Sequence, residues 1–356
     1  MKQIKVIVLL IVLALFTVQS CKREPDMTKA PVYNPQPYPF QKPFGFPNMV
    51  VPADNPLTIQ GVDLGRHLFY EKRLSGNNTL SCAGCHMQQF AFTDTARFSI
   101  GIDGIAGTRQ SMVLQNLGWM NSFFWDGRAA TLEEQVLEPV SNPIEMHQQW
   151  TVAITKLKAD NMYRRKFFEA FGQYDFDSTH AAKAMAQFLR TLVSANSKYD
   201  KYLRGELILT SDEFAGLNSF NSLTGADCFH CHGGILFTDN FFHNNGKNLV
   251  HTDAGFGEVT GNANDVGKFK APTLRNIQYS APYMHDGTMP TLDSVINFYS
   301  FHVNHGSPNI SPLMEFSFQG GVQLNAIERM QLKAFLLTLS DSEFISNPKF
   351  SNPFTQ

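Results

Sequence analysis

The pentapeptide Cys-X-X-Cys-His occurs twice in this chain of 356 residues, as CAGCH at Cys82–His86 and as CFHCH at Cys228–His232. Two cysteines at this spacing, followed directly by histidine, are typical of covalent c-type haem attachment. The two thiols form thioethers with the haem, and the histidine then lies under the iron as a ligand. The sequence therefore predicts two covalently bound haem c groups. Their attachment residues are Cys82, Cys85, Cys228 and Cys231, and their iron ligands are His86 and His232.

Paired cysteines at this spacing also occur in redox disulfides and in zinc sites. A redox motif needs no histidine after its second cysteine, and a zinc site would require both pairs to converge on one ion. Two complete pentapeptides in one chain favour haem attachment over both alternatives.

The N-terminus has the pattern of an export signal. Lys2 and Lys5 flank the start of an apolar run that is short for a transmembrane helix. Cleavage between Ser20 and Cys21 would expose the fifth cysteine for lipidation, as in a bacterial lipoprotein. We therefore expect a signal peptide at residues 1–20, a periplasmic location, and membrane contact only through a lipid anchor at Cys21. A plain signal peptide or a retained N-terminal segment is the alternative.

The remaining chain divides into a tether and two halves. Residues 21–46 are rich in proline, which predicts an extended tether. The chain after residue 46 is long enough for two domains with separate cores, and one haem motif falls in each half. We predict an N-terminal haem domain at residues 47–205 and a C-terminal haem domain at residues 206–345.

Helical patterns dominate the body of the chain. Apolar residues recur at helical spacing in residues 150–171 and 181–193. Thr131 and Asn325 each begin a capping sequence, and Pro139 is expected to end the helix that Thr131 begins. Runs with strand alternation are scarce. The sequence predicts a mostly α-helical fold with few strands, in which two cytochrome c-like haem domains pack against each other.

Composition restricts the class of partner. The chain has 29 basic and 31 acidic residues, for a net charge of −2. This balance argues against nucleic acid as a partner. Charged residues make up only 17% of the chain, whereas phenylalanine contributes 31 residues, a composition suited to lining two large apolar cofactors.

The two halves repeat a series of short motifs. After each pentapeptide come a Phe-Thr-Asp tripeptide, an aromatic residue with Asp-Gly, and Thr-Leu followed by an acidic residue. The paired segments are 92–94 and 237–239, 125–127 and 285–287, and 131–133 and 291–293. This order indicates an internal duplication.

The order of the longer blocks resembles the bacterial di-haem cytochrome c peroxidase superfamily, in particular its MauG-like branch. Beside the two pentapeptides, the blocks are FWDGR at 124–128, TLEEQ at 131–135, NPIEM at 142–146, PTLRN at 272–276 and APYMHDG at 281–287. The resemblance covers about residues 64–339. It implies an enzyme that reduces hydrogen peroxide to water, with electrons that a cytochrome c or a small copper protein delivers through the C-terminal haem. The alternatives are a MauG-like oxidase that modifies residues of a protein substrate and a non-catalytic electron-transfer cytochrome.

The resemblance implies that the haem on His86 is the peroxidatic one. It assigns to Glu133 the acid–base role above the open iron site. Many members carry a glutamine before the FWDGR block, where this chain has Phe123. Distal hydrogen bonding is thus left to Glu133 alone or to another group such as Gln135. The alternative for Glu133 is stabilisation of a helix N-terminus.

Many members bind a histidine as the second ligand of this haem until the other haem is reduced. Residues 87–124 contain no histidine, and Met112 and Met120 are the alternative weak ligands. We therefore expect the peroxidatic haem to be open in the fully oxidised protein.

The second iron ligand of the C-terminal haem also differs among members of the superfamily. Many members have methionine where this chain has Tyr299, and MauG-like members have tyrosine. The resemblance thus implies that Tyr299 binds the iron that His232 binds, and a phenolate ligand there would stabilise the ferric state. The alternative is that Tyr299 only packs, and that iron is bound by Met284, Met289, His302 or His305.

Other residues are expected to support the cofactors. Arg128 and Arg275 are expected to pair with haem propionates, with ordinary ion pairs as the alternative. The superfamily commonly holds a calcium ion, for which the matching groups here are Gln110 and the carbonyl groups of Ser280 and Pro282.

Two tryptophans, Trp119 and Trp125, are candidates for an electron path between the haems. A buried tryptophan more often belongs simply to the core. The sequence leaves both alternatives open.

Overall fold

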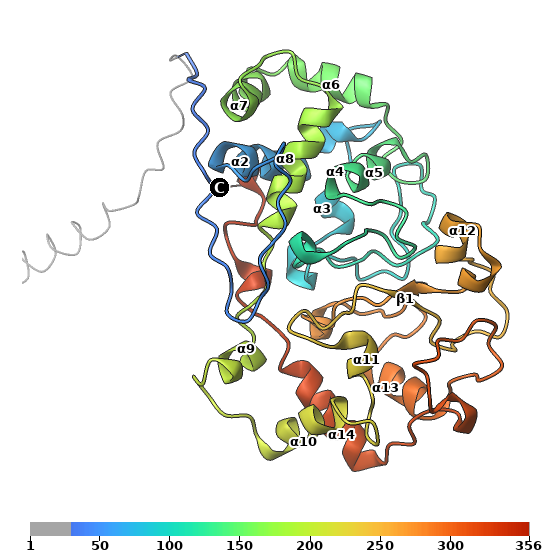
Figure 1. Ribbon diagram of the computed structural model, residues 1–356. Helices are drawn as coiled ribbons and strands as arrows, with labels where there is room; N and C mark the ends of the chain where they lie inside the picture. Colours follow the sequence, from blue (N-terminus) through green and yellow to red (C-terminus); the bar gives the residue numbers. More distant parts are fainter. Residues whose placement is uncertain (1–29, 356) are drawn as a thin grey trace, which may run out of the picture. The chain divides into compact units, whose positions relative to one another are not determined.

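The computed structural model describes residues 30–355, which Figure 1 draws in colour. The expected signal peptide and Cys21 lie outside the described residues. The chain from Tyr33 onward forms one compact unit, and the fold is described within it. No helix of the described part is long and apolar enough to cross a membrane.

The described chain is mostly helical. Its α-helices are α2 (Ile59–Phe69), α3 (Cys82–Cys85), α4 (Leu132–Gln135), α5 (Glu138–Ser141), α6 (Trp150–Lys158), α7 (Asn161–Phe171), α8 (Ser178–Arg190), α9 (Lys198–Leu203), α10 (Ser211–Phe220), α11 (Phe229–His232), α12 (Phe256–Thr260), α13 (Leu292–Phe301) and α14 (Ala326–Leu337). Short 3₁₀-helices are η1 (Lys72–Leu74), η2 (Gln88–Phe90), η3 (Leu117–Trp119), η4 (Ala263–Asp265), η5 (Ile277–Tyr279), η6 (Ser317–Gln319), η7 (Phe344–Ser346) and η8 (Pro353–Thr355). The strands β1 (Phe242–His243) and β2 (Phe269–Lys270) pair antiparallel. The expectation of a mostly helical chain with few strands is confirmed.

Helices α2 and α8 lie side by side (Figure 1), and one hydrophobic cluster gathers around them. A Cβ atom added at Gly65 of α2 would overlap the carbonyl oxygen of Ala184 in α8. The two helices therefore approach so closely that only glycine fits at their crossing.

A second cluster gathers around α10 and α14. Gly216 of α10 faces the carbonyl oxygen of Gln331 in α14 in the same way. Phe188 lies beside the first crossing and Phe335 beside the second. The equivalent contacts in the two helix pairs agree with an internal duplication. The division at residues 205 and 206 stays a prediction.

Two of the expected helices differ in detail. Thr131 caps α4 as expected, but Pro139 lies in the first turn of α5 and does not end the preceding helix. Proline is tolerated there because the first turn of a helix has no partner for its N–H groups. The expected helix over residues 150–171 is divided in two, because the side chain of Asp160 caps the start of α7.

Candidate haem sites

The first attachment motif is held by a short helix and a turn. Cys82 and Cys85 lie in α3, and His86 follows directly. The Nδ1 atom of His86 lies 2.9 Å from the carbonyl oxygen of Phe92. Since a carbonyl only accepts, Nδ1 carries the hydrogen and Nε2 keeps its lone pair for a metal. The imidazole of His86 is thus oriented as an iron ligand requires.

The second motif repeats this arrangement. Nδ1 of His232 lies 3.3 Å from the carbonyl oxygen of Phe237. Phe92 and Phe237, which begin the repeated Phe-Thr-Asp tripeptides, have positive φ angles of 59° and 53°. A left-handed conformation is unfavourable for phenylalanine. Its occurrence at both positions shows that each turn is shaped to present a carbonyl group to the histidine.

A cavity of about 640 Å³ lies beside His86. Its volume is within the range typical of ligand sites. Ser99, Ile100 and Gly101, which belong to the segment between residues 87 and 124, form part of its wall. His86 is the only histidine among the described residues that line it, although Met112 and Met120 also do so. The wall therefore supplies no second imidazole for an iron bound to His86.

Glu145 and Gln135 line this cavity. Asn142 donates a hydrogen bond of 2.7 Å from Nδ2 to Oε1 of Glu145. Burial raises the pKa of Glu145 above its ordinary value, more than the bond from Asn142 lowers it. A half-buried carboxyl group that burial makes a weaker acid is suited to accept and return a proton in a cavity.

Glu133 lies elsewhere and is absent from the cavity lining. Its carboxylate accepts hydrogen bonds of 2.7 and 2.9 Å from Arg190 and one of 2.6 Å from Asn55. Burial alone would raise the pKa of Glu133, but the bonds from Arg190 and Asn55 lower it. This placement does not support the acid–base role expected for Glu133. Sequence reasoning missed Glu145, although the NPIEM block that contains it is part of the family resemblance.

A smaller cavity, of about 230 Å³, lies beside the second motif. Cys228, Cys231 and His232 line it, and so do Tyr299 and Met284. Met289, His302 and His305 are not among its lining residues. Of the candidates for the second iron ligand, the structure thus brings Tyr299 and Met284 to the cavity that contains His232.

Asn245 connects these two candidates. Its Nδ2 atom donates to the phenol oxygen of Tyr299 at 3.0 Å and lies 3.6 Å from the sulfur of Met284. Burial raises the pKa of Tyr299, and the bond from Asn245 partly opposes this. The amide of Asn245 therefore fixes the direction in which the Tyr299 oxygen points.

Both arginines expected to bind propionates have carboxylate partners within the protein. Arg128 pairs with Asp126 and Glu138. Arg275 is fully buried, and its two terminal nitrogens donate to Asp200 at 2.8 and 2.9 Å. These contacts match the ordinary ion pairs given as the alternative. A propionate contact for Arg128 or Arg275 stays a prediction.

The residues expected to hold calcium lie near one another. Gln110, Ser280 and Pro282 all line the cavity beside His232. Nε2 of Gln110 donates to the hydroxyl of Thr93 at 2.8 Å, which leaves the Oε1 oxygen of Gln110 for another contact. The donor set is oxygen-rich, as calcium prefers.

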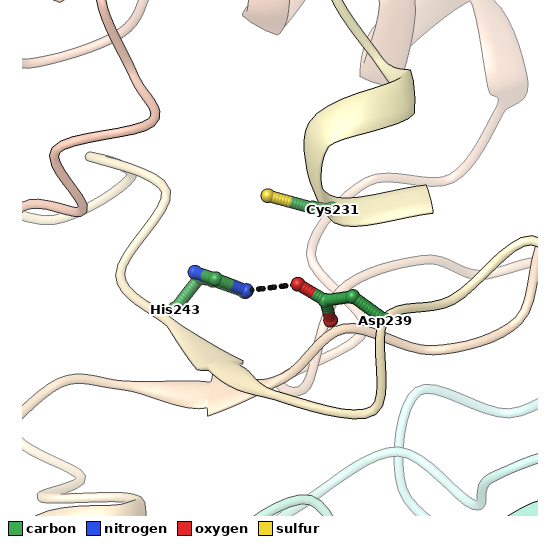
Figure 2. Close-up of side chains that lie close together, drawn as sticks. All are labelled: Cys231, Asp239 and His243. Carbon is green, nitrogen blue, oxygen red and sulfur yellow. Dashed lines mark hydrogen bonds and ion pairs between the residues drawn. The ribbon is translucent and has the colours of Figure 1, made fainter. Parts of the chain in front are cut away.

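Figure 2 shows a further group beside the second motif, formed by Cys231, Asp239 and His243. Asp239 and His243 form an ion pair of 2.7 Å. Burial lowers the pKa of His243, but the contacts with Asp239 and Cys231 outweigh it and raise the pKa to about 9. Because Cys231 belongs to the attachment motif, its sulfur is the atom expected to form a haem thioether, and we do not assign a separate metal site to this group.

Trp125 lines both cavities. Its indole Nε1 donates to the carbonyl oxygen of Gln110 at 2.8 Å. Trp119 lines neither cavity and packs against Phe40 and Phe46. Of the two tryptophans, Trp125 alone is placed between the haem sites.

Two attachment motifs, each with an oriented imidazole and a cavity, define a di-haem protein. A family model described as di-haem cytochrome c peroxidase matches residues 59–207. MauG, the methylamine utilization protein of Methylophilus methylotrophus, is 31% identical over 303 residues, which are 84% of this chain and 87% of MauG. The chain belongs to the di-haem cytochrome c peroxidase family.

Other relatives extend the comparison. The cytochrome c peroxidase Ccp of Escherichia coli is 36% identical over 264 residues, which are 70% of this chain and 55% of Ccp. The crystal structure of a MauG-like protein associated with microbial copper homeostasis superposes with a TM-score of 0.82 at 36% identity, covering 89% of this chain and 99% of that chain. The di-haem peroxidase BthA from Burkholderia thailandensis, at 21% identity and a TM-score of 0.70, shares the fold. The chain is therefore a peroxidase-type oxidoreductase with haem cofactors, as the sequence predicted.

Proposed function

We propose that this chain attaches two haem c groups through its two motifs and reduces hydrogen peroxide in the cavity beside His86. The observation that carries this proposal is that Glu145 and Gln135 line the same cavity as His86, and that His86 is the one histidine in the lining formed by the described residues. Electrons come from a small donor protein, a cytochrome c or a copper protein, and enter through the haem on His232. Each turnover consumes two electrons and two protons and converts one hydrogen peroxide to two waters.

Glu145 is the residue that moves the proton in this proposal. The haem, when bound, supplies the redox chemistry and the site at which peroxide is reduced. Glu145 accepts the proton of one peroxide oxygen at its carboxylate and returns it to the other oxygen, which leaves as water. Asn142 holds Oε1 of Glu145 in place, and the amide of Gln135 offers a further hydrogen-bond donor in the cavity.

The test compares two glutamates of the same region. Glu145→Gln removes the proton acceptor and should slow the reaction of the oxidised holoprotein with hydrogen peroxide by about 100-fold or more. Glu133→Gln is the matched control and should leave this rate nearly unchanged. It should instead lower the free energy of unfolding by about 2 kcal/mol, because Arg190 loses its charged partner. Stopped-flow spectroscopy and chemical unfolding measure the two effects. A slow reaction in Glu133→Gln with a normal rate in Glu145→Gln would reverse the assignment.

Tyr299 is proposed as the second ligand of the iron bound to His232. Support comes from its place in the second cavity and from the bond that Asn245 donates to its oxygen. Trp125, which lines both cavities, is proposed to lie on the electron path between the haems.

A MauG-like oxidase acting on a protein substrate is the second candidate function. The features that favour it are Tyr299 in the second cavity and the lack of a second histidine in the described lining of the first. The two functions separate in one experiment, in which hydrogen peroxide is added to the oxidised holoprotein with either a reduced cytochrome c or a candidate protein substrate. Rapid cytochrome oxidation supports the peroxidase, and oxidised residues found by mass spectrometry support the MauG-like function.

Calcium and the membrane anchor complete the proposal. Gln110, Ser280 and Pro282 are proposed to bind a calcium ion, which chelator treatment followed by metal analysis of the holoprotein would test.

We further propose export to the periplasm with a lipid anchor at Cys21, which mass spectrometry of the mature N-terminus would reveal.

A further inference from the structure

Lys270 is a buried cation in the wall between the two haem cavities. It lines both of them, and only 3% of its surface is exposed. It ends strand β2, and its backbone N–H donates to the carbonyl oxygen of Trp125 at 2.8 Å. Lys270 is thus fixed to the segment that separates the cavities.

The ammonium group of Lys270 has few partners. Its Nζ atom donates to the backbone oxygen of Ser122 at 2.5 Å and lies 3.3 Å from the Ser122 hydroxyl. An ammonium group has three hydrogens to donate, and both acceptors come from one residue. Donor capacity therefore remains on the side of the cavities.

Lys270 differs from the other basic side chains there. Among the described residues, the other basic side chains that line either cavity are Arg109 and Arg128. Arg109 pairs with Asp126 and Asp253, and Arg128 pairs with Asp126 and Glu138. No ion pair joins Lys270 to a carboxylate within residues 30–355. Asp239 attracts it only from a distance and pairs instead with His243.

A buried charge without a counter-charge is costly. Burial lowers the pKa of Lys270 to about 8, which reflects this cost. A carboxylate in either cavity could accept a hydrogen bond from the Lys270 ammonium group and offset the cost of burying its charge. A charge-assisted hydrogen bond is strong in a buried site. Each haem carries two propionate carboxylates, so the cofactors themselves supply the missing anion.

We propose that Lys270 binds a haem propionate in the wall shared by the two cavities and that its positive charge raises the reduction potential of that haem. The proposal rests on haem occupying the two cavities, and not on the peroxidase reaction. Lys270 would then supply the propionate partner that the sequence assigned to Arg128 and Arg275, whose side chains pair with Asp126 and Asp200.

The potential should respond to Lys270 because a nearby cation favours the state with the additional electron. Removal of the charge in Lys270→Met should shift the ferric–ferrous equilibrium of at least one haem about tenfold toward ferric, which is about 59 mV for a one-electron couple. Lys270→Arg keeps the charge and should restore most of the potential.

Lys268→Met is the matched control, since Lys268 lies two residues away, pairs with Asp265 and lines neither cavity. The potentials of both haems are measured by spectroelectrochemistry on the holoproteins, with haem content checked by the pyridine haemochrome assay. Unchanged potentials in fully loaded Lys270→Met would overturn the proposal.

A second measurement applies if Lys270→Met takes up too little haem. The propionate-bending bands are then compared in resonance Raman spectra of wild type, Lys270→Arg and Lys268→Met. These bands respond to a change of the hydrogen-bond donor. A shifted band in Lys270→Arg but not in Lys268→Met supports the contact, and identical bands in all three proteins refute it. Neither measurement uses hydrogen peroxide, so the result is independent of the proposed activity.

Discussion

Two glutamates close together in the sequence have opposite environments. Glu133 accepts bonds from Arg190 and Asn55, which hold its carboxylate in the charged state. Glu145 has one amide partner, and burial raises its pKa. The environment, and not the residue type, therefore decides which of the two carboxyl groups takes up a proton more readily.

The raised pKa of Glu145 predicts the pH dependence of peroxide reduction. Glu145 must be ionised to accept a proton, so the rate should fall as the pH decreases through its pKa. The midpoint should lie above the ordinary glutamate value of about 4.3. Rates of peroxide reaction measured from acid to neutral pH test this, with Glu145→Gln expected to lack the acid limb and Glu133→Gln to keep it. A midpoint at or below the ordinary value would contradict the role of Glu145.

Tyr299 leads to a prediction about the second haem. Tyr299→Met replaces an anionic oxygen ligand with a thioether, which should raise the reduction potential of the haem on His232. The control is Tyr283→Phe, because Tyr283 lines the same cavity but its hydroxyl donates to the carbonyl oxygen of Ile277 at 2.8 Å. Potentiometric titration measures the reduction potentials of both variants. Equal potentials in wild type and Tyr299→Met would mean that another group, such as Met284, binds the iron.

At the scale of elements, the most instructive contacts are the two glycine crossings. Gly65 meets Ala184 where α2 crosses α8, and Gly216 meets Gln331 where α10 crosses α14. Neither contact follows from the periodicity of one helix, since each depends on which helices pair. Sequence reasoning could predict helices, but not the crossing that makes glycine necessary.

These crossings predict a loss of stability in both halves. Gly65→Ala and Gly216→Ala each place a methyl group against a backbone oxygen, which should cost about 1 to 3 kcal/mol. Gly306→Ala is the control, because its added Cβ would meet only Leu249, at an ordinary distance of 3.6 Å. Urea unfolding of the three holoproteins and the wild type gives their free energies of unfolding for comparison. A loss confined to one of the two crossings would argue against their equivalence.

Capping residues explain where prediction of the helices succeeded and failed. Thr131 and Asn325 both begin helices through their side chains, as the sequence predicted. The prediction for Pro139 was wrong because a proline can begin a helix as readily as it follows one. Asp160 divides a segment whose apolar pattern continues through the break. Apolar spacing alone cannot detect such a break.

At the scale of the whole molecule, local sequence patterns are enough to predict the attachment residues, but not the other residues that line the two cavities. The pentapeptides assign four cysteines and two histidines by local chemistry. Glu145, Asn245 and Lys270 lie apart in the sequence from the motifs whose cavities they reach. Only folding brings these three residues to the cavities. The one indication of Glu145 in the sequence was its place in the NPIEM block.

A buried ion pair spans the predicted domain boundary. Arg275 and Asp200 form two hydrogen bonds with almost no exposure, and Arg275 also donates to the carbonyl oxygen of Ile235. Breaking such a pair leaves an uncompensated buried charge. The contact therefore joins the chain before residue 205 to the segment that follows the second haem motif.

We propose that the cavity beside His86 is open to hydrogen peroxide in the fully oxidised protein. The measurement that tests it most directly is rapid mixing of the oxidised di-haem protein with hydrogen peroxide, with no reductant present, followed by optical spectroscopy. An open site should give an immediate change in the haem spectrum, and Glu145→Gln should slow that change. A spectrum that stays unchanged until one electron is added would show that a ligand closes the site beside His86.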